Sequence, residues 1–188
     1  MKKELTKRLL SSLIIAPIAL FFIIKGSVFF IFFLVIIFLV TSYEWLNMSK
    51  KLKKLKIFGI CFLFSSFVLA YLLRKTQGFD LFLFIILISV LTDLGGYIFG
   101  KIFKGPKLTK ISPNKTYSGV IGSFLVSVIG GLIYLEFLPG VLFWSYFNGY
   151  EQAGIGYNLF TLLIISIISL ISQLGDLTIS FFKRLAKI

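Results

Sequence analysis

The sequence predicts an all-α polytopic membrane protein, a bundle of about six transmembrane helices. Of its 188 residues, 58% are apolar and 14% are charged, and the mean hydropathy is +1.00, which is unusual for a water-soluble domain. The apolar residues also fall into runs that are bounded by charged residues or glycine. We therefore expect a single membrane domain over residues 1–188.

The six expected spans cover residues 9–24, 27–40, 57–73, 81–99, 119–138 and 158–177. At about 1.5 Å per residue each can cross the hydrocarbon core, the first two only with local thinning or flanking side chains. The N-terminal spans lie within residues 1–99, a Lys-rich loop covers 100–118, and residues 119–188 carry part of the expected site. No small-residue cleavage pattern follows the first run, so we expect it to be retained rather than removed as a signal peptide.

The basic residues predict the orientation of these spans. If the N-terminus is cytoplasmic, the segments 1–8, 41–56, 100–118 and the C-terminal tail hold 4, 5, 5 and 3 Lys or Arg, while the opposite loops hold only Lys25, Arg74 and Lys75. This asymmetry is what the positive-inside rule predicts, so both termini should be cytoplasmic. The sequence contains no motif in which basic and aromatic residues alternate, so nucleic acid is not an expected partner. The expected partner is anionic lipid or phosphate.

The composition narrows the available chemistry. The chain has no His and a single Cys, Cys61, which excludes an intrachain disulfide, a Cys-based metal site and a His general base. Any catalysis must therefore use carboxylates, hydroxyls, Lys and backbone groups.

Asp93 is the first polar anomaly at membrane depth. Positions 93, 97 and 101 share a helical face, and Gly96 and Gly100 form a small-xxx-small pair that favours close helix approach beside the carboxylate. An ionisable group in a span usually lines a cavity, and the alternative is a structural Asp that bonds neighbouring helices.

Asp176 is the second anomaly. A polar stripe follows one face of the last helix at spacings of three or four residues: Ser169, Ser172, Asp176, Ser180 and Lys183. From Asp176 to Lys183 the rise is roughly 10 Å, about the extent of a diphosphate with its metal ion. The alternative is that the Ser hydroxyls bond the preceding turn, and that Lys183 and Arg184 only end the span.

The Lys-rich loop supplies the third element. Residues 112–116 predict a turn that enters the fifth helix, with free backbone N–H groups and Lys115 where a phosphate would bind. A solvated basic loop is the alternative. Two carboxylates and this loop together suit the binding of a phosphorylated substrate with Mg²⁺ at the inner face.

Three segments resemble the phosphatidate cytidylyltransferase (CDP-diacylglycerol synthase) family: residues 92–101 (TDLGGYIFGK), 110–119 (KISPNKTYSG) and 172–184 (SQLGDLTISFFKR). Their order and spacing match the family as well. The first 90 residues are similar only in hydropathy and in the segment 43–45.

The resemblance implies a multipass enzyme of phospholipid biosynthesis in the bacterial cell (inner) membrane. It implies cytidylyl transfer from CTP to phosphatidate, giving CDP-diacylglycerol and pyrophosphate, with Mg²⁺ as cofactor. Membrane lipid is a further expected partner, and a homodimer is left open. The roles implied are Mg²⁺ ligation by Asp176, phosphate orientation by Ser172 and Ser180, phosphate binding by Lys183 and Arg184, nucleotide contacts by Lys115 and Thr116, and lining of the cavity by Asp93.

The sequence departs from the family at its end. The family signature continues into a Lys-Asp pair, a Pro-x-His-Gly-Gly segment and Asp-Arg-x-Asp, whereas this sequence ends at Ile188. The missing carboxylates belong to the metal site, and Asp176 alone does not supply ligands for two cations. We therefore expect a C-terminally truncated member that makes little or no CDP-diacylglycerol; turnover comparable to that of a full-length relative would contradict this.

Two other functions stay open at this point. In a small secondary transporter, Asp93 and Asp176 would be intramembrane coupling sites, although no inverted repeat is visible. A membrane scaffold would bind anionic lipid through the Lys loops and leave both Asp residues unexplained.

Overall fold

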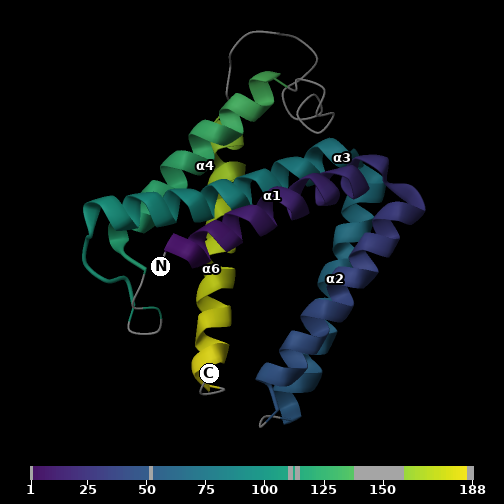
Figure 1. Cartoon of the computed structure of the whole chain (residues 1–188). Helices are drawn as coiled ribbons and strands as arrows, with labels where there is room; N and C mark the ends of the chain where they lie inside the picture. The colour runs from purple at the N-terminus through teal and green to yellow at the C-terminus, as the bar shows by residue number, and fades with distance from the viewer. Residues whose placement is uncertain (1, 51–52, 110–111, 113–114, 138–158, 186–188) are drawn as a thin grey trace. The chain divides into compact units, whose positions relative to one another are not determined.

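The computed structural model describes residues 2–50, 53–109, 112, 115–137 and 159–185. Over these ranges it contains five helices and no strand, which confirms the all-α prediction (Figure 1). The helices are α1 (Lys2–Lys25), α2 (Ser27–Met48), α3 (Lys53–Phe103), α4 (Tyr117–Phe137) and α6 (Leu159–Leu185). Of the predicted turn at 112–116, residues 113 and 114 lie outside the described residues.

Four described helices are long and apolar enough to cross a membrane: Ser27–Met48, Leu55–Phe103, Tyr117–Phe137 and Leu159–Leu185. The first predicted span overlaps the shorter apolar stretch Ile14–Lys25. The number of six spans, the cytoplasmic termini and the single domain stay predictions.

Gly78 interrupts α3 at its midpoint. Its φ of 86° and ψ of 177° lie outside the helical region, so the 51-residue helix consists of two parts, 53–77 and 79–103, that meet at a kink. A positive φ is readily accessible only to glycine. The break falls between the predicted spans 57–73 and 81–99, and it adjoins the boundary of two compact units, Met1–Phe79 and Asp80–Ile188.

In the unit Met1–Phe79, α1 and α2 form a helical hairpin through Gly26, whose φ is 64°. Arg74 of α3 closes this turn: its Nε donates to the carbonyl of Ile23 at 3.0 Å, and its Nη2 donates to that of Ile24 at 3.3 Å. The last carbonyls of a helix have no partner within the helix, and the helix dipole favours a cation there. Arg74 therefore caps the C-terminus of α1.

We expect Arg74→Ala to lower the free energy of unfolding by about 2 kcal/mol, since hydrogen bonds from a charged donor would be lost. Thermal unfolding in detergent, followed by circular dichroism, measures the change. Lys75→Ala is the control because its ammonium group bonds no backbone carbonyl in the described residues. Equal effects of the two substitutions would contradict the capping role.

Helix α2 is longer than the predicted span, which ended at residue 40. Trp45 explains the extension: its Nε1 donates to the carbonyl of Leu55 at 3.3 Å, and its indole lies against Gly59, where a Cβ would overlap the ring. Phe38 adds edge-to-face contacts with Phe64 and Phe67, with ring centroids 6.2 and 5.6 Å apart. The 43–45 segment therefore belongs to α2 rather than to the loop after it.

In the unit Asp80–Ile188, small residues bring the second part of α3 close to α4. A Cβ on Gly96 would lie 2.7 Å from Ser123 Oγ, and one on Gly100 would lie 3.1 Å from Thr116 Oγ1. The predicted close approach beside Asp93 is thus present in the structure. Small residues at such a contact allow two backbones to pack without intervening side chains.

Helix α4 also packs along α6 (Figure 1). At their contact a Cβ on Gly131 would lie 2.7 Å from Ile88 and 2.9 Å from Ile165, and both Ile side chains are fully buried. The outer face of α6 exposes apolar side chains, among them Leu163, Ile167 and Ile171. An apolar outer face over a small, tightly packed interior suits a lipid environment.

Candidate functional site

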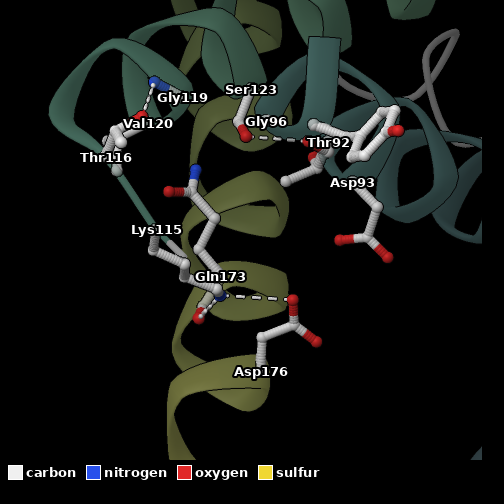
Figure 2. Close-up of a pocket in the computed structure, with 11 residues that line it drawn as sticks. Thr92, Asp93, Gly96, Lys115, Thr116, Gly119, Val120, Ser123, Gln173 and Asp176 are labelled. Atoms are coloured by element: carbon white, nitrogen blue, oxygen red, sulfur yellow. Dashed lines mark hydrogen bonds and ion pairs between the residues drawn. The ribbon is translucent and has the colours of Figure 1, made fainter. Parts of the chain in front are cut away.

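A cavity of about 350 Å³ lies in the unit Asp80–Ile188, where the second part of α3, the start of α4 and α6 meet (Figure 2). Most of the side chains around it are polar or small, although the helices themselves are strongly apolar. The lining residues are Thr92, Asp93, Gly96, Tyr97, Lys115, Thr116, Gly119, Val120, Ser123, Gln173 and Asp176.

The loop before α4 holds Lys115 at the cavity. Its two arms are joined by hydrogen bonds from Leu108 N to the carbonyl of Lys115 at 2.8 Å and from Tyr117 N to that of Pro106 at 3.1 Å. A β-bridge pairs Lys107 with Thr116 between these bonds. The backbone of Lys115 is therefore fixed from both sides, which directs its long side chain.

Thr116 is the N-cap of α4. Its Oγ1 accepts a hydrogen bond from Gly119 N at 3.1 Å, the third helical N–H, as an N-cap side chain does. Since Tyr117 N is also bonded, two of the first three N–H groups of α4 are already used. Within the predicted turn 112–116, Ser112 N donates to Thr109 Oγ1 at 3.2 Å and Lys115 N donates to the carbonyl of Ser112 at 3.1 Å, so the prediction of free N–H groups is wrong for Ser112 and Lys115.

We expect Thr116→Val to destabilise the protein by about 1 kcal/mol, because the cap is lost while the side-chain volume is nearly kept. Thr116→Ser keeps a hydroxyl at this position and should retain most of the stability. Thermal unfolding in detergent checks both variants. If Thr116→Ser were as unstable as Thr116→Val, the hydroxyl would not be acting as a cap.

Lys115 links the loop to α6. Its Nζ lies 3.2 Å from Asp176 Oδ2 and donates to the carbonyl of Gln173 at 3.3 Å (Figure 2). The Asp176 side chain is 55% exposed and that of Lys115 is 25% exposed, so the carboxylate stays accessible from the cavity. A ligand that enters can therefore reach both partners of the ion pair.

Asp93 brings a second carboxylate to the same cavity. It comes from α3 and lines the cavity together with Asp176 and Lys115 (Figure 2). Two carboxylates repel each other and Lys115 compensates only one of them. The arrangement therefore favours an additional cation between the two acidic side chains.

A network of hydroxyl groups supports these residues from the buried side. Ser123 Oγ donates to the carbonyl of Thr92 at 2.7 Å, and the hydroxyls of Thr92 and Ser169 are hydrogen-bonded at 2.9 Å. Gln173 Nε2 donates to Ser169 Oγ at 3.5 Å. Because these groups join α3, α4 and α6, they fix the positions from which Asp93 and Asp176 project.

The structure brings four of the eight predicted site residues together: Asp93, Lys115, Thr116 and Asp176 line the cavity. The other four, Ser172, Ser180, Lys183 and Arg184, do not line it. The Ser180 hydroxyl donates to the carbonyl of Asp176 at 2.8 Å, which is the bond to the preceding turn given above as the alternative. Lys183 and Arg184 are exposed in the last turn of α6.

Four lining residues with a polar side chain were not among the predicted site residues: Thr92, Tyr97, Ser123 and Gln173. Thr92 adjoins Asp93, and Gln173 precedes Asp176 by three residues. Both lie in otherwise apolar helices. A polar residue beside an intramembrane carboxylate was therefore an available signal. Ser123 carried a weaker one, since it adjoins Gly122 in a helix with several small residues.

The donor set of the cavity suits a hard divalent cation. Carboxylate and hydroxyl oxygens are the ligands that Mg²⁺ prefers, and Mg²⁺ is commonly held by one or two carboxylates together with substrate phosphates and water. Among the described residues there is no group of three His, Cys, Asp or Glu that would form a complete protein cage. The residues present thus fit a cation shared with a phosphorylated ligand.

Comparisons with known proteins cover the part of the chain that holds this cavity. A sequence model of the cytidylyltransferase family matches residues 51–188, a range that contains all three motifs and every cavity residue. The phosphatidate cytidylyltransferase of Staphylococcus saprophyticus subsp. saprophyticus is 40% identical over 112 residues, which are 58% of this chain and 37% of the relative. The enzymes of that name from Staphylococcus haemolyticus and Staphylococcus aureus (strain COL) are 38% and 40% identical over the same shares.

The aligned segment thus spans little more than a third of these curated relatives. No solved structure matches the chain. The family match covers well over half of the sequence and agrees with the resemblance carried by the three motifs, so the chain belongs to the cytidylyltransferase family.

Proposed function

We propose that the cavity is part of the active site of a phosphatidate cytidylyltransferase of the bacterial cell membrane. The observation that supports this most is the meeting of two carboxylates and one Lys in a polar cavity between apolar helices. Ionisable groups at this depth are costly unless they serve binding or catalysis. A phosphorylated lipid and a nucleotide both offer the phosphate oxygens that such a site would hold.

In the proposed reaction an oxygen of the phosphatidate phosphate attacks the α-phosphorus of CTP. A new P–O bond forms, the bond to the β-phosphate oxygen breaks, and pyrophosphate leaves with the electron pair. Asp93 and Asp176 would hold Mg²⁺, which when bound neutralises the phosphate charge. Lys115 would bind a nucleotide phosphate oxygen and keep the reacting groups in line.

The exposed cations at the end of α6 have a place in this proposal. Lys183 lies seven residues, or roughly 10 Å, beyond Asp176 along the helix. We assign Lys183 and Arg184 to the phosphate of the lipid headgroup, which approaches from the membrane surface. The roles of Ser172 and Ser180 in orienting phosphate oxygens, and of Thr116 at the nucleotide, stay predictions.

Equilibrium binding of radiolabelled CTP tests the proposal. The purified chain is placed in nanodiscs that contain phosphatidate, with and without Mg²⁺. We expect saturable binding that requires Mg²⁺ and is displaced by unlabelled CTP. We choose binding rather than turnover as the measurement, because the aligned segment covers only 37% of the relatives' length. Absence of Mg²⁺-dependent binding would overturn the proposal, and solute flux in proteoliposomes without nucleotide would favour a transporter instead.

A further inference from the structure

A second concave region lies in the unit Met1–Phe79 and shares no residue with the cavity. It is a groove of about 580 Å³ between α2 and the first part of α3. Apart from the Tyr71 hydroxyl its lining is apolar, and it includes Ile31, Val35, Phe38, Phe64, Phe67 and Tyr71. From Ile31 to Leu39 the groove follows α2 for about 12 Å, enough for a large part of one acyl chain.

One end of this groove is strongly basic. Lys75 follows Tyr71 by one helical turn on the same face of α3, and its Nζ lies 5.9 Å from the centre of the Tyr71 ring. The adjacent Arg74 reaches the α1–α2 turn at Gly26, next to Lys25. Lys75 and Arg74 thus lie at this end of the groove, and Lys25, whose Nζ is 6.0 Å from the centre of the Phe21 ring, adjoins the turn that Arg74 contacts.

These three cations outnumber the acidic side chains in the same part of the sequence. None of the three forms an ion pair with a carboxylate among the described residues. The closest acidic residue in the sequence is Asp80, five residues after Lys75, and the next is Glu44, which lies 18 residues beyond Gly26 on α2, or roughly 27 Å. A local excess of positive charge is therefore available to an external anion.

We propose that this hairpin binds one anionic phospholipid. An acyl chain occupies the α2–α3 groove, and the headgroup phosphate lies at Lys75 and Lys25, with Arg74 adding to the positive potential while it caps α1. Charge selects this occupant: an apolar groove alone accepts any acyl chain, whereas three cations that form no ion pair with a carboxylate in the described part of the chain favour a headgroup with net negative charge. In the predicted topology these three residues are also the only Lys or Arg in the non-cytoplasmic loops, whereas the other basic residues lie on the cytoplasmic side.

Native mass spectrometry of the whole chain in detergent tests this proposal. The chain is titrated with phosphatidylglycerol and, separately, with phosphatidylcholine of the same acyl chains. We expect phosphatidylglycerol to bind at least about fivefold more tightly, since each Lys near an anionic surface contributes a factor of that order. Lys75→Gln should lower the affinity for phosphatidylglycerol about fivefold, and Lys25→Gln combined with it should remove the preference.

Two further variants separate the charge from the groove. Lys50→Gln changes an exposed cation at the other end of α2 and should leave both affinities unchanged. Val35→Trp fills the groove and should weaken both lipids equally, and circular dichroism shows that each variant is folded. Equal binding of the two lipids by the unchanged chain, or equal losses in Lys50→Gln and Lys75→Gln, would overturn the proposal. A dimer that is dissociated by Val35→Trp but unaffected by lipid would also overturn the proposal, because a second copy of the chain would then occupy the groove.

Discussion

Asp176→Asn is expected to lower Mg²⁺-dependent CTP binding on the order of 100-fold, the upper range for loss of a group that holds or orients a metal. Asn has nearly the same size and can still accept a hydrogen bond from Lys115, so the contact between the loop before α4 and α6 should persist. What disappears is the negative charge that a cation needs. Equilibrium binding of radiolabelled CTP at several Mg²⁺ concentrations measures the effect, which excess Mg²⁺ should partly restore.

Asp80→Asn provides the matched control. Asp80 begins the same compact unit but does not line the cavity, and its carbonyl rather than its carboxylate accepts the bond from Tyr134. This variant should bind CTP as the unchanged chain does. If Asp176→Asn also bound CTP normally, Asp176 would not contribute to a cation site.

Gly95→Ala should lower the free energy of unfolding by about 1–3 kcal/mol through overpacking. A Cβ at this position would collide with the carbonyl oxygen of Gly122 on α4 and lie 2.9 Å from Val126. A backbone atom cannot move aside as a flexible side chain can, so α3 and α4 must separate. Because Asp93 and Ser123 project from these two helices, CTP binding should weaken as well. Thermal unfolding in detergent and the CTP assay measure the two effects.

Gly175→Ala is the corresponding control on α6. A Cβ on Gly175 would meet no atom within 4 Å, so only the intrinsic preference of the helix applies. Ala is favoured over Gly by about 1 kcal/mol inside a helix, and this variant should be as stable as the unchanged chain or more stable. A loss of stability comparable to that of Gly95→Ala would show that the effect arises from the added methyl group itself and not from helix packing.

The helices could be predicted from hydropathy because a membrane span must form its backbone hydrogen bonds internally. The ends of the helices could not be predicted in this way. The predicted span at 27–40 stops where Thr41 and Ser42 lower the hydropathy, yet α2 continues to Met48. The Thr41 hydroxyl bonds the carbonyl of Ile37, and the Trp45 indole packs on Gly59 of α3. Hydropathy records neither interaction, since both depend on the helix and its neighbour being formed.

The site shows a similar limit. Spacings of three and four residues are equally compatible with one helical face, so Ser172, which was predicted, and Gln173, which was not, fit the pattern beside Ser169 and Asp176 equally well. The structure turns Gln173 toward the cavity, because Ser169 is buried against Thr92 and this contact sets the rotation of α6. Polar residue type identified the carboxylates and Lys115, whereas the choice between neighbouring positions depended on packing.

The contact between Lys115 and Asp176 has a consequence for membrane insertion. An acidic side chain without a partner would oppose the entry of α6 into hydrocarbon, and this opposition would be present during synthesis, before nucleotide or lipid substrate is encountered. The 3.2 Å contact supplies the chain with a built-in counter-ion. The unit Asp80–Ile188 can therefore assemble in the membrane before its ligands bind.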